Sequence, residues 1–266
     1  MYEKVNPCHP DKVADRIAGA IVDLAYKNVK NPKIAVEVLI GHGVCHTIIE
    51  TSEIMETKKI EKIIKRIGGD LVCDISLFPQ DKHLSKNQDN KIKCGDNGIF
   101  VGLPIRKEEH ILSKLCKEFY KDFKTDAKFI LDLKDNILTI CQSNASNENI
   151  YRLASKSNYK LNINPLGEWK GGTDVDTGAT NRKLGSDMGF AVTGGGLHGK
   201  DLSKADITLN VYAHLKAQVE NAKVEIYCSI GDEYVDNKPY CEIVEIVRDY
   251  IFYKGGFEKF AEWGLI

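Results

Sequence analysis

Ten of the chain's 22 glycines lie between Gly167 and Gly199, and three of them are consecutive, at Gly194, Gly195 and Gly196. Glycine weakens helices and strands, so a stretch this rich in it is typical of loops and turns. The regular elements must therefore come from the residues on either side. Over its 266 residues the chain is 42% hydrophobic and 28% charged, an ordinary globular composition with enough length for one large core or two smaller ones.

Helical and extended patterns alternate outside the glycine-rich stretch. Apolar residues at helical spacing predict helices over 11–26, 60–67, 108–123, 150–154, 204–221 and 240–252. Apolar and β-branched runs predict strands over 34–40, 44–49, 71–77, 129–133, 137–141 and 224–230. The polar run 79–95 predicts a long loop. We therefore expect an α+β fold of antiparallel sheets with helices on one face, in three similar helix-plus-sheet units over 1–107, 108–160 and 161–266.

Charge balance and hydropathy exclude several classes of partner. Lys and Arg total 37 against 38 Asp and Glu, so no basic excess favours nucleic acid or an anionic membrane. No apolar run approaches the roughly 20 residues of a membrane helix, and the first residues lack the pattern of a signal peptide. The eight cysteines contain no closely spaced pair of the kind that binds zinc. We expect free thiols in a reducing compartment and a cytoplasmic location.

The segment from Gly194 to Asp201 carries the most specific local motif. Glycine amides approach phosphate oxygens closely, Lys200 adds positive charge, and the helix predicted from residue 204 adds its dipole. The spacing Gly-x-x-x-x-Gly-Lys matches a P-loop, but Asp201 stands where a Ser or Thr would contact magnesium. By itself this pattern fits a polyphosphate site and a flexible turn with a solvated lysine about equally well.

Two further motifs suit the same chemistry. Residues 174–183 place two aspartates before Arg182 and Lys183, so carboxylates could hold an ammonium or a metal while the cations hold phosphate. A solvated loop is the simpler explanation of that segment. The sequence His-Pro-Asp-Lys from His9 opens the first helix, where Asp11 could bind magnesium or cap the helix.

Three weaker candidates have simple structural explanations. Asp96 is most simply a turn residue. Asp126 and Lys128 could form a surface pair, which contributes little to stability. His42 and His46 are four residues apart, but the pattern around them is strand-like and no third ligand is evident, so we interpret both as structural.

Taken in order along the chain, these segments resemble the S-adenosylmethionine synthetases, also called methionine adenosyltransferases. Residues 8–15 resemble the family's Gly-His-Pro-Asp-Lys helix start, 95–98 its Gly-Asp-Gln-Gly, and 126–128 its Asp-Ala-Lys. Residues 163–167 resemble Asn-Pro-Thr-Gly, 171–183 the block that ends in Leu-Thr-Gly-Arg-Lys, and 194–206 the Gly-Gly-Gly block that ends in Lys-Asp-x-x-Lys-x-Asp, with one residue fewer. Six collinear motifs imply the family's fold in a short and compact version.

The resemblance implies a role for each matching residue. The implied catalytic residues are His9, Lys128, Arg182, Lys183, Lys200 and Lys204. ATP would be bound by His9, Asp126, Ala127, Lys128, Glu168, Trp169, Asp176, Arg182, Lys183, Leu197 and Lys200, with Trp169 replacing a phenylalanine that stacks on adenine. Methionine would be bound by Glu50, Gln80, Asp96, Asp176 and Lys204. Asp11 and Asp206 would hold magnesium, two ions in all, and Glu37 would hold potassium.

The implied reaction joins ATP, methionine and water to give S-adenosylmethionine, phosphate and diphosphate. The methionine sulfur attacks C5′ of ATP, and the released triphosphate is hydrolysed in the same site. The family also implies a homodimer with active sites at the subunit interface, with a dimer of dimers as a further state.

The chain also departs from the family's sequences at several positions. Residues 78–83 occupy the place of the family's Gln-Ser-Pro-Asp-Ile methionine loop, with Gln80 as the nearest match. Glu168 stands where the family has arginine, residues 173–175 replace Pro-x-Gly, and Thr193 replaces a histidine. Two alternatives therefore stay open: a relative that hydrolyses ATP or tripolyphosphate or uses another nucleophile, and a non-catalytic nucleotide-binding partner subunit.

Overall fold

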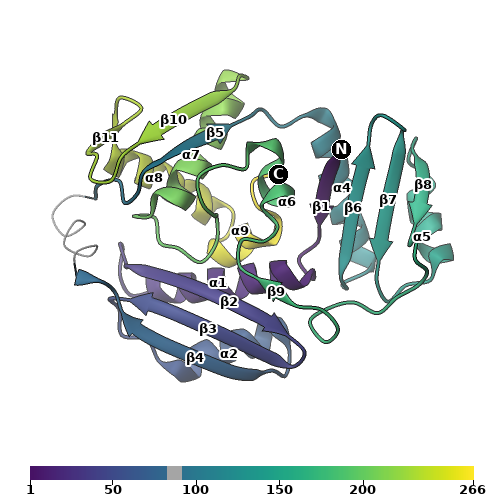
Figure 1. The fold of residues 1–266 in the computed structure, drawn as a ribbon, viewed down its shortest axis with the longest axis horizontal. Coiled ribbons are helices and arrows are strands. Elements are labelled where there is room, and N and C mark those ends of the chain that lie inside the picture. The colour runs from purple at the N-terminus through teal and green to yellow at the C-terminus, as the bar shows by residue number, and fades with distance from the viewer. Residues whose placement is uncertain (83–91) are drawn as a thin grey trace.

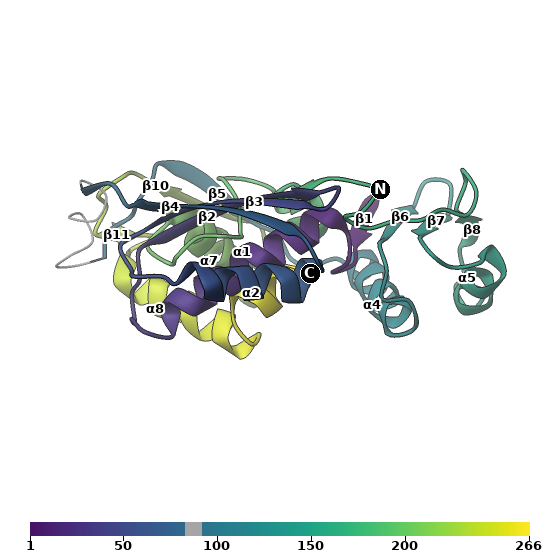
Figure 2. The ribbon, with the colours of Figure 1, turned by 90° about the horizontal axis from the view of Figure 1, so that it is seen from below.

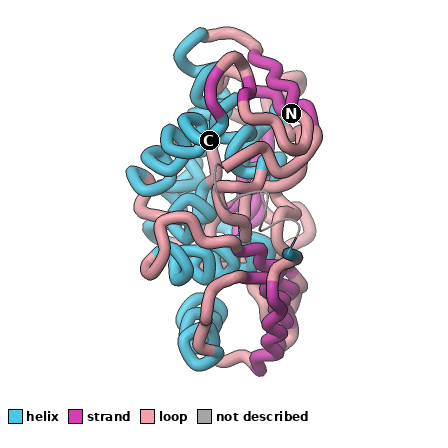
Figure 3. The backbone as a smooth tube through the Cα atoms, turned by 90° about the vertical axis from the view of Figure 1, so that its left-hand side faces the viewer, coloured by secondary structure: helices cyan, strands magenta, loops and turns pink. Residues whose placement is uncertain are grey.

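Strands and helices form separate layers in this chain. A computed structural model describes residues 1–82 and 92–266. In Figure 2 the strands make up the upper layer, and the long helices lie against its lower side. Figure 3, coloured by secondary structure, shows the same separation from another direction. The predicted α+β class, with helices on one face of the sheets, is confirmed.

The first four-stranded sheet runs in the order β4-β3-β2-β9. Its strands are β2 (Ile34–Gly41), β3 (Val44–Thr51), β4 (Val72–Pro79) and β9 (Gly178–Ala179). β2 and β3 form an antiparallel hairpin, but β3 and β4 are parallel, which corrects the wholly antiparallel sheet expected from the sequence. The reason is the connection between them, because α2 (Thr57–Gly68) returns the chain to the same end of the sheet before β4 begins.

The second four-stranded sheet has the order β1-β6-β7-β8 and stands beside the first (Figure 1). Its strands are β1 (Tyr2–Val5), β6 (Ala127–Asp132), β7 (Ile137–Gln142) and β8 (Lys160–Ile163). The predicted hairpin of the central unit is confirmed as β6 and β7. β7 and β8 are parallel because α5 (Asn147–Ala154) connects them, so this sheet is also mixed. α4 (Lys107–Asp122) packs on β1 and β6.

The remaining elements are two short strand pairs and a group of helices from the second half of the chain. β5 (Gly98–Gly102) pairs with β10 (Val224–Cys228), and the short β11 (Tyr234–Val235) pairs with β12 (Lys238–Pro239). The helices here are α6 (Leu184–Met188), the 3₁₀ helix Gly189–Ala191, α7 (Ala205–Glu220), α8 (Tyr240–Tyr253) and α9 (Phe257–Trp263). Within 1–82 and 92–266, no helix combines the length and hydropathy that a membrane span requires.

Two hydrophobic cores hold these layers together. The larger surrounds α1 (Pro10–Tyr26), whose Ile17 and Ile21 are fully buried between the first sheet and the C-terminal helices. The smaller lies between the second sheet and its helices, and Tyr2 of β1 belongs to it. Since β1 belongs to one core and α1 to the other, the residues between them, including His9, lie at the junction. The predicted unit boundaries at 107/108 and 160/161 stay a prediction.

Candidate active site

The start of α1 is packed against a turn that comes some 170 residues later in the chain. His9 is the N-cap, and its Nδ1 accepts a hydrogen bond from the Asp11 amide at 3.2 Å, while Pro10 occupies the first helical turn. One Asp11 carboxylate oxygen accepts from the Ala179 amide at 2.9 Å. Only glycine fits at Gly178, because a Cβ there would lie 2.1 Å from the Pro10 carbonyl carbon. The helix start and residues 178–179 are therefore held as one unit.

Cations surround the Asp11 carboxylate. Lys183 Nζ lies 2.7 Å from its second oxygen, and Arg182 Nε lies 3.6 Å from the first. Burial raises the pKa of the Asp11 carboxyl, but the hydrogen bonds from Lys183 and the Ala179 amide outweigh burial, so the pKa is lower than usual and the group is ionised. Burial and then Lys183 lower the pKa of His9 to about 4, so this imidazole is neutral at neutral pH.

Asp126 and Lys128 lie at the start of β6, close to the same place. The Asp126 side chain is buried and accepts a hydrogen bond from the Gly172 amide, so the surface pair considered for it is wrong. Burial, together with a smaller effect of the nearby Asp176 carboxylate, raises the pKa of Asp126 to about 7. Lys128 Nζ pairs with Glu3 at 2.5 Å. We call the set that these contacts and charge interactions bring together the Asp11 group: His9, Asp11, Asp126, Lys128, Asp176, Arg182 and Lys183.

A second set lies on the glycine-rich loop and the start of α7. Lys200 Nζ forms an ion pair with Asp206, which is in the first turn of α7, and Lys204 is the N-cap of that helix. The backbone at Lys200 makes a bridge to Ala35 of β2, which fixes the loop on the sheet. We call Lys200, Lys204 and Asp206 the Lys200 group. Among the described residues, no side-chain hydrogen bond or ion pair joins it directly to the Asp11 group.

Asp201, which stands where a P-loop has Ser or Thr, has a structural role in the loop. Its side chain is 1% exposed, one oxygen accepts from the Ile34 amide at 2.7 Å, and the other accepts from the Ser203 amide at 2.8 Å. Asp201 therefore fastens the loop to β2, and its carboxylate is already used by the backbone. Leu197 is also fully buried, so a contact of this residue with ATP would have to use its backbone.

Glu37 and Glu50 lie on the face of the first sheet that no helix within 1–82 and 92–266 covers. Ala35 is paired with Glu50 and Glu37 with Ile48, so all of these side chains point to one side. Glu37 accepts a hydrogen bond from the Thr180 hydroxyl, which follows β9. His46, two strand positions from Ile48, pairs with Asp74 at 2.9 Å on the same face, in agreement with a structural role.

The other two residues assigned to methionine lie on either side of the segment 83–91. Gln80 is buried directly after β4, and its backbone N–H donates a hydrogen bond to the Thr51 carbonyl at 3.2 Å. Asp96 is exposed in a turn, and its carboxylate accepts from the Asn97 amide at 2.8 Å. The middle of the predicted 79–95 loop, residues 83–91, lies outside the described residues. Within the described ranges, no side-chain hydrogen bond or ion pair joins Gln80 or Asp96 to either group.

Trp169 lies beside Asp126. Its indole Nε1 donates to Asn164 at 3.2 Å, and a Cβ at Gly171 would touch both the indole ring and the Asp126 side chain, at 2.6 and 2.9 Å. The partly exposed ring is thus fixed next to the Asp11 group, where a planar base could stack on it. Glu168, which was also assigned to ATP, accepts a hydrogen bond from the backbone N–H of Asn147 at the start of α5, at 2.8 Å.

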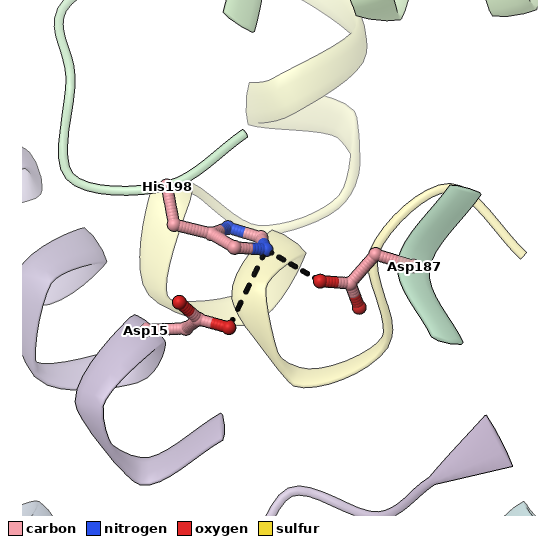
Figure 4. Close-up of side chains that lie close together, drawn as sticks. All are labelled: Asp15, Asp187 and His198. Carbon is pink, nitrogen blue, oxygen red and sulfur yellow. Dashed lines mark hydrogen bonds and ion pairs between the residues drawn. The ribbon is translucent and has the colours of Figure 1, made fainter. Parts of the chain in front are cut away.

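A buried charge network beneath the site was missed from the sequence. Lys12, Asp15, Asp187 and His198 come from α1, α6 and the glycine-rich loop. Figure 4 shows three of them, Asp15, Asp187 and His198. Lys12 Nζ lies 2.7 Å from Asp187 and 3.2 Å from Asp15, and His198 Nε2 lies 2.9 Å from Asp187. The only local signal was the Lys12 and Asp15 pair, three residues apart on an otherwise apolar helix face.

The network is better described as an ion pair than as a metal site. Asp15, Asp187 and His198 offer ligand atoms within 4.8 Å of one another, as a metal ion would need. The Lys12 ammonium, however, already lies between the two carboxylates. Burial lowers the pKa of Lys12, but the two aspartates outweigh burial and raise it, while Lys12 and His198 hold the pKa of Asp187 well below its usual range. The cation of this cluster is the lysine.

Asp11 and Asp206 suit magnesium better. Each lies at the start of a helix and forms an ion pair with a lysine, Asp11 with Lys183 and Asp206 with Lys200. The Asp11 carboxyl also has a lowered pKa. Magnesium is commonly held by one or two carboxylates together with phosphate oxygens, so this donor set fits the ion once a polyphosphate is present. For potassium, the Glu37 carboxylate and the Thr180 hydroxyl offer oxygen donors side by side.

Comparison with known proteins agrees with these motifs. Residues 1–94 match the model of the S-adenosylmethionine synthetase N-terminal domain. An S-adenosylmethionine synthase of Mycoplasma capricolum is 28% identical over 77% of this chain and 68% of its own length. An S-adenosylmethionine synthase of Fusobacterium nucleatum is 29% identical over 89% of this chain and 76% of its own length.

The fold agrees as well. A solved structure described as an unusual S-adenosylmethionine synthetase from Campylobacter jejuni superposes with a TM-score of 0.78 at 18% identity, covering 100% of this chain and 95% of the other. Nearly every residue of each chain therefore has a counterpart in the other fold. In sequence motifs and in fold, the chain is similar to the S-adenosylmethionine synthetases.

Proposed function

We propose that the protein is a methionine adenosyltransferase, which makes S-adenosylmethionine from ATP and methionine. The observation that carries the proposal is the Asp11 group, in which a neutral imidazole, three cations and carboxylates from three distant segments meet beside an aromatic ring. Such a group suits the adenosine and triphosphate parts of ATP. The homologues' names supply the methionine part of the proposal.

The chemistry requires alignment and charge neutralisation rather than a base. The methionine sulfur is a neutral nucleophile, so its in-line attack on C5′ forms the S–C5′ bond as the C5′–O bond to the triphosphate breaks, and no proton is removed. Holding the two reactants in line lowers the barrier by reducing the entropy lost at the transition state. Cations aimed at the leaving triphosphate stabilise the charge that develops there.

Three of the cations bind the triphosphate in that scheme. Arg182 and Lys183 would bind phosphate oxygens from the turn after β9, and Lys200 would bind them from the glycine-rich loop. Neutral His9 would donate a hydrogen bond near the breaking C5′–O bond. Magnesium held by Asp11 and Asp206 would supply further positive charge to the triphosphate. The same cations would keep the released triphosphate in place while water hydrolyses it to phosphate and diphosphate.

Methionine would bind on the uncovered sheet face. We infer that Glu50, Asp96 and Asp176 attract its ammonium group, that Lys204 pairs with its carboxylate, and that Gln80 contributes a polar contact. Glu37 would hold potassium near Lys200, where a monovalent cation would help to fix the loop.

The active form in this proposal is a homodimer. The uncovered face of the sheets exposes large apolar side chains, each at least half exposed: Leu39, Ile48, Val72, Phe78, Ile99 and Tyr227. An exposed apolar face of this kind is typical of a protein interface. Glu37 and Glu50 lie on this same face, so a second subunit packed there would bring its own site residues close to them. Light scattering tests the proposal: a single 29.8 kDa species with full activity would contradict it.

Mass spectrometry of the reaction products tests the function. The purified chain is incubated with ATP, magnesium, potassium and methionine, and S-adenosylmethionine and phosphate are followed together. Formation of both, dependent on methionine, is the expected result. Phosphate without S-adenosylmethionine would favour the hydrolase alternative, and ATP binding without turnover would favour the non-catalytic partner.

A further inference from the structure

We propose that Cys94 and Cys228 are a redox-sensitive pair, which a peroxide converts reversibly into a disulfide. Neither thiol takes part in the proposed reaction, so the pair is a further site. Cys228 is the last residue of β10, and Cys94 lies shortly before β5, the strand that pairs with β10 (Figure 1). The turn between Cys94 and β5 carries Asp96.

The two thiols share one hydrogen-bond acceptor. The Sγ atoms of Cys94 and Cys228 each donate to the Asp96 carbonyl oxygen at 3.3 Å. The two thiols also form a hydrogen bond with each other. Sulfur atoms in direct contact are close enough for a bond to form after a small displacement of the side chains.

Main-chain hydrogen bonds hold the two cysteines on adjoining segments. The Cys94 N–H donates to the Asp232 carbonyl at 2.9 Å, and the Gly231 N–H donates to the Cys94 carbonyl at 2.8 Å. Cys228 is in register with Gly98 of β5. The segment around Cys94 is therefore tied both to the end of β10 and to the turn after it, and the thiols stay together in the folded chain.

The surroundings favour reaction at Cys94. The hydrogen bond with Cys228 lowers the pKa of the Cys94 thiol more than burial raises it, whereas the same contact and burial raise the pKa of Cys228. A thiol with a lowered pKa has a larger fraction of thiolate, which is the nucleophile. Cys228 keeps 9% of its surface exposed, and Asp96 is exposed, so the pair lies directly beneath a surface turn that a small oxidant can reach.

A second pair of cysteines shows that proximity on a sheet does not produce this arrangement. Cys45 and Cys73 are in register on the neighbouring strands β3 and β4. The Cys45 thiol, however, contacts the Thr47 hydroxyl at 3.5 Å, and the Cys73 thiol donates to the Leu71 carbonyl at 3.5 Å. Each is bonded to a residue of its own segment, so this pair serves as an internal control.

Oxidation proceeds in two steps and uses one molecule of hydrogen peroxide. The Cys94 sulfur attacks one peroxide oxygen, so that an S–O bond forms, the O–O bond breaks, and hydroxide leaves with the thiol proton as water. The Cys228 sulfur then attacks the Cys94 sulfur, so that the S–S bond forms, the S–O bond breaks, and a second water leaves with the Cys228 proton. The two thiols lose two electrons, which reduce the peroxide to water. A dithiol reductant returns the electrons by exchange.

The disulfide changes the contacts of the turn that carries Asp96. Because a disulfide has no S–H donor, the Asp96 carbonyl loses both of its thiol partners. The effect on catalysis rests on the proposed function, in which Asp96 attracts the methionine ammonium group. We expect KM for methionine to rise about threefold or more on oxidation, because small displacements of positioning groups are costly, while KM for ATP stays unchanged.

Peptide mapping by mass spectrometry tests the pair directly. The wild-type chain is treated with hydrogen peroxide, unfolded with an alkylating reagent present, and digested without reductant. The expected product is a peptide containing Cys94 linked to one containing Cys228, lighter than their sum by two hydrogen atoms and absent after treatment with dithiothreitol. Cys45 and Cys73 should be alkylated instead. The matched control is Cys241→Ser, which removes an exposed thiol and should form the same link.

Cys94→Ala and Cys228→Ala should each abolish the linked peptide and make KM for methionine insensitive to peroxide, and either variant suffices if the other does not fold. Peroxide treatment that leaves both thiols alkylated, or that links Cys45 to Cys73 in their place, would overturn the inference. A Cys94–Cys228 link with unchanged KM for methionine would overturn its effect on the turn. If the reduced chain makes no S-adenosylmethionine, the proposed function fails while the peptide map still decides whether the pair forms.

Discussion

Lys12→Met would remove the ammonium that two buried carboxylates share. The Lys12, Asp15 and Asp187 side chains are all fully buried, and Lys12 Nζ lies 2.7 Å from Asp187 and 3.2 Å from Asp15. Methionine has a similar length and an adaptable apolar side chain, so the substitution changes charge far more than packing. His198 would then be the one described partner left near both carboxylates.

The expected loss of stability is large. Removing one partner of a buried ion pair typically costs about 3–5 kcal/mol, because it leaves an uncompensated charge in the interior. A domain is stable by about 5–15 kcal/mol in total. For a chain of this size, the same loss lowers the unfolding temperature by roughly 10 °C or more. The effect should be seen at neutral pH, where both partners are charged.

The pH range follows from the two pKa shifts. The pKa of Asp187 is below its ordinary value, so its contribution is present above the ordinary aspartate range and is lost as the pH falls through the lowered pKa. The pKa of Lys12 is raised, so its contribution is present below the ordinary lysine range and is lost as the pH rises through the raised pKa. Wild type and Lys12→Met should therefore differ most between these limits.

Urea unfolding followed by circular dichroism measures the effect. The matched control is Lys59→Met, which removes an exposed lysine paired with Glu56 at 2.6 Å and should leave the midpoint unchanged. The double variant Lys12→Met/Asp187→Asn should lose less stability than the sum of its single variants, because each removes the charge that the other leaves unpaired. If Lys12→Met unfolds at the wild-type midpoint, the reasoning that Lys12 neutralises these carboxylates is refuted.

Four further predictions concern the site itself. Asp206→Asn should lower kcat by roughly a hundredfold or more with unchanged unfolding, and an unchanged kcat would remove Asp206 from the triphosphate site. Nuclear magnetic resonance of His9 should show a neutral imidazole down to about pH 5, because its pKa is lowered to about 4, and a midpoint near that of free histidine would contradict this. Since burial raises the pKa of Asp126 to about 7, the folded chain loses stability as the pH rises toward 7, so Asp126→Asn should raise the urea midpoint more at about pH 8 than at about pH 5 while weakening ATP binding. Tripolyphosphate should bind more weakly after magnesium is removed with a chelator, and equal calorimetric affinities would exclude a shared site.

Much of the fold follows from local patterns in the sequence. The helix predicted over 11–26 is α1, Pro10–Tyr26, because its apolar period extends over four turns. Strand direction could not be read in this way, since alternation is the same in parallel and antiparallel strands, and so the β3–β4 pair was expected to be antiparallel. β9 has only two residues, too few for an alternation of apolar and polar residues to predict a strand. Its place depends on the contact of Gly178 with Pro10, which only the folded chain creates.

The candidate site likewise has a part that the sequence predicted and a part that it did not. Short motifs predicted that His9, Asp11 and Lys183 share one kind of chemistry, and the structure brings them together. The partners of Lys12 could not be predicted, because Asp187 and His198 are distant from it in sequence, Asp187 lies in no predicted motif, and His198 occupies an unspecified position of the glycine-rich motif. The hydrogen bonds of the Asn181 side chain could not be predicted for a related reason, since its three partners are backbone atoms, whose positions no residue type reveals.

The pairing of charges in the ligand-free chain explains why polyphosphate and magnesium should bind together. Lys183 and Lys200 each pair with an aspartate, so neither group of residues leaves its central charges unpaired. When the two ammonium groups turn to phosphate oxygens, Asp11 and Asp206 lose their partners, and carboxylates left in that state are costly unless another cation replaces the lysines. A divalent cation that also contacts phosphate satisfies this need. The arrangement therefore links anion and cation binding through the exchange of partners.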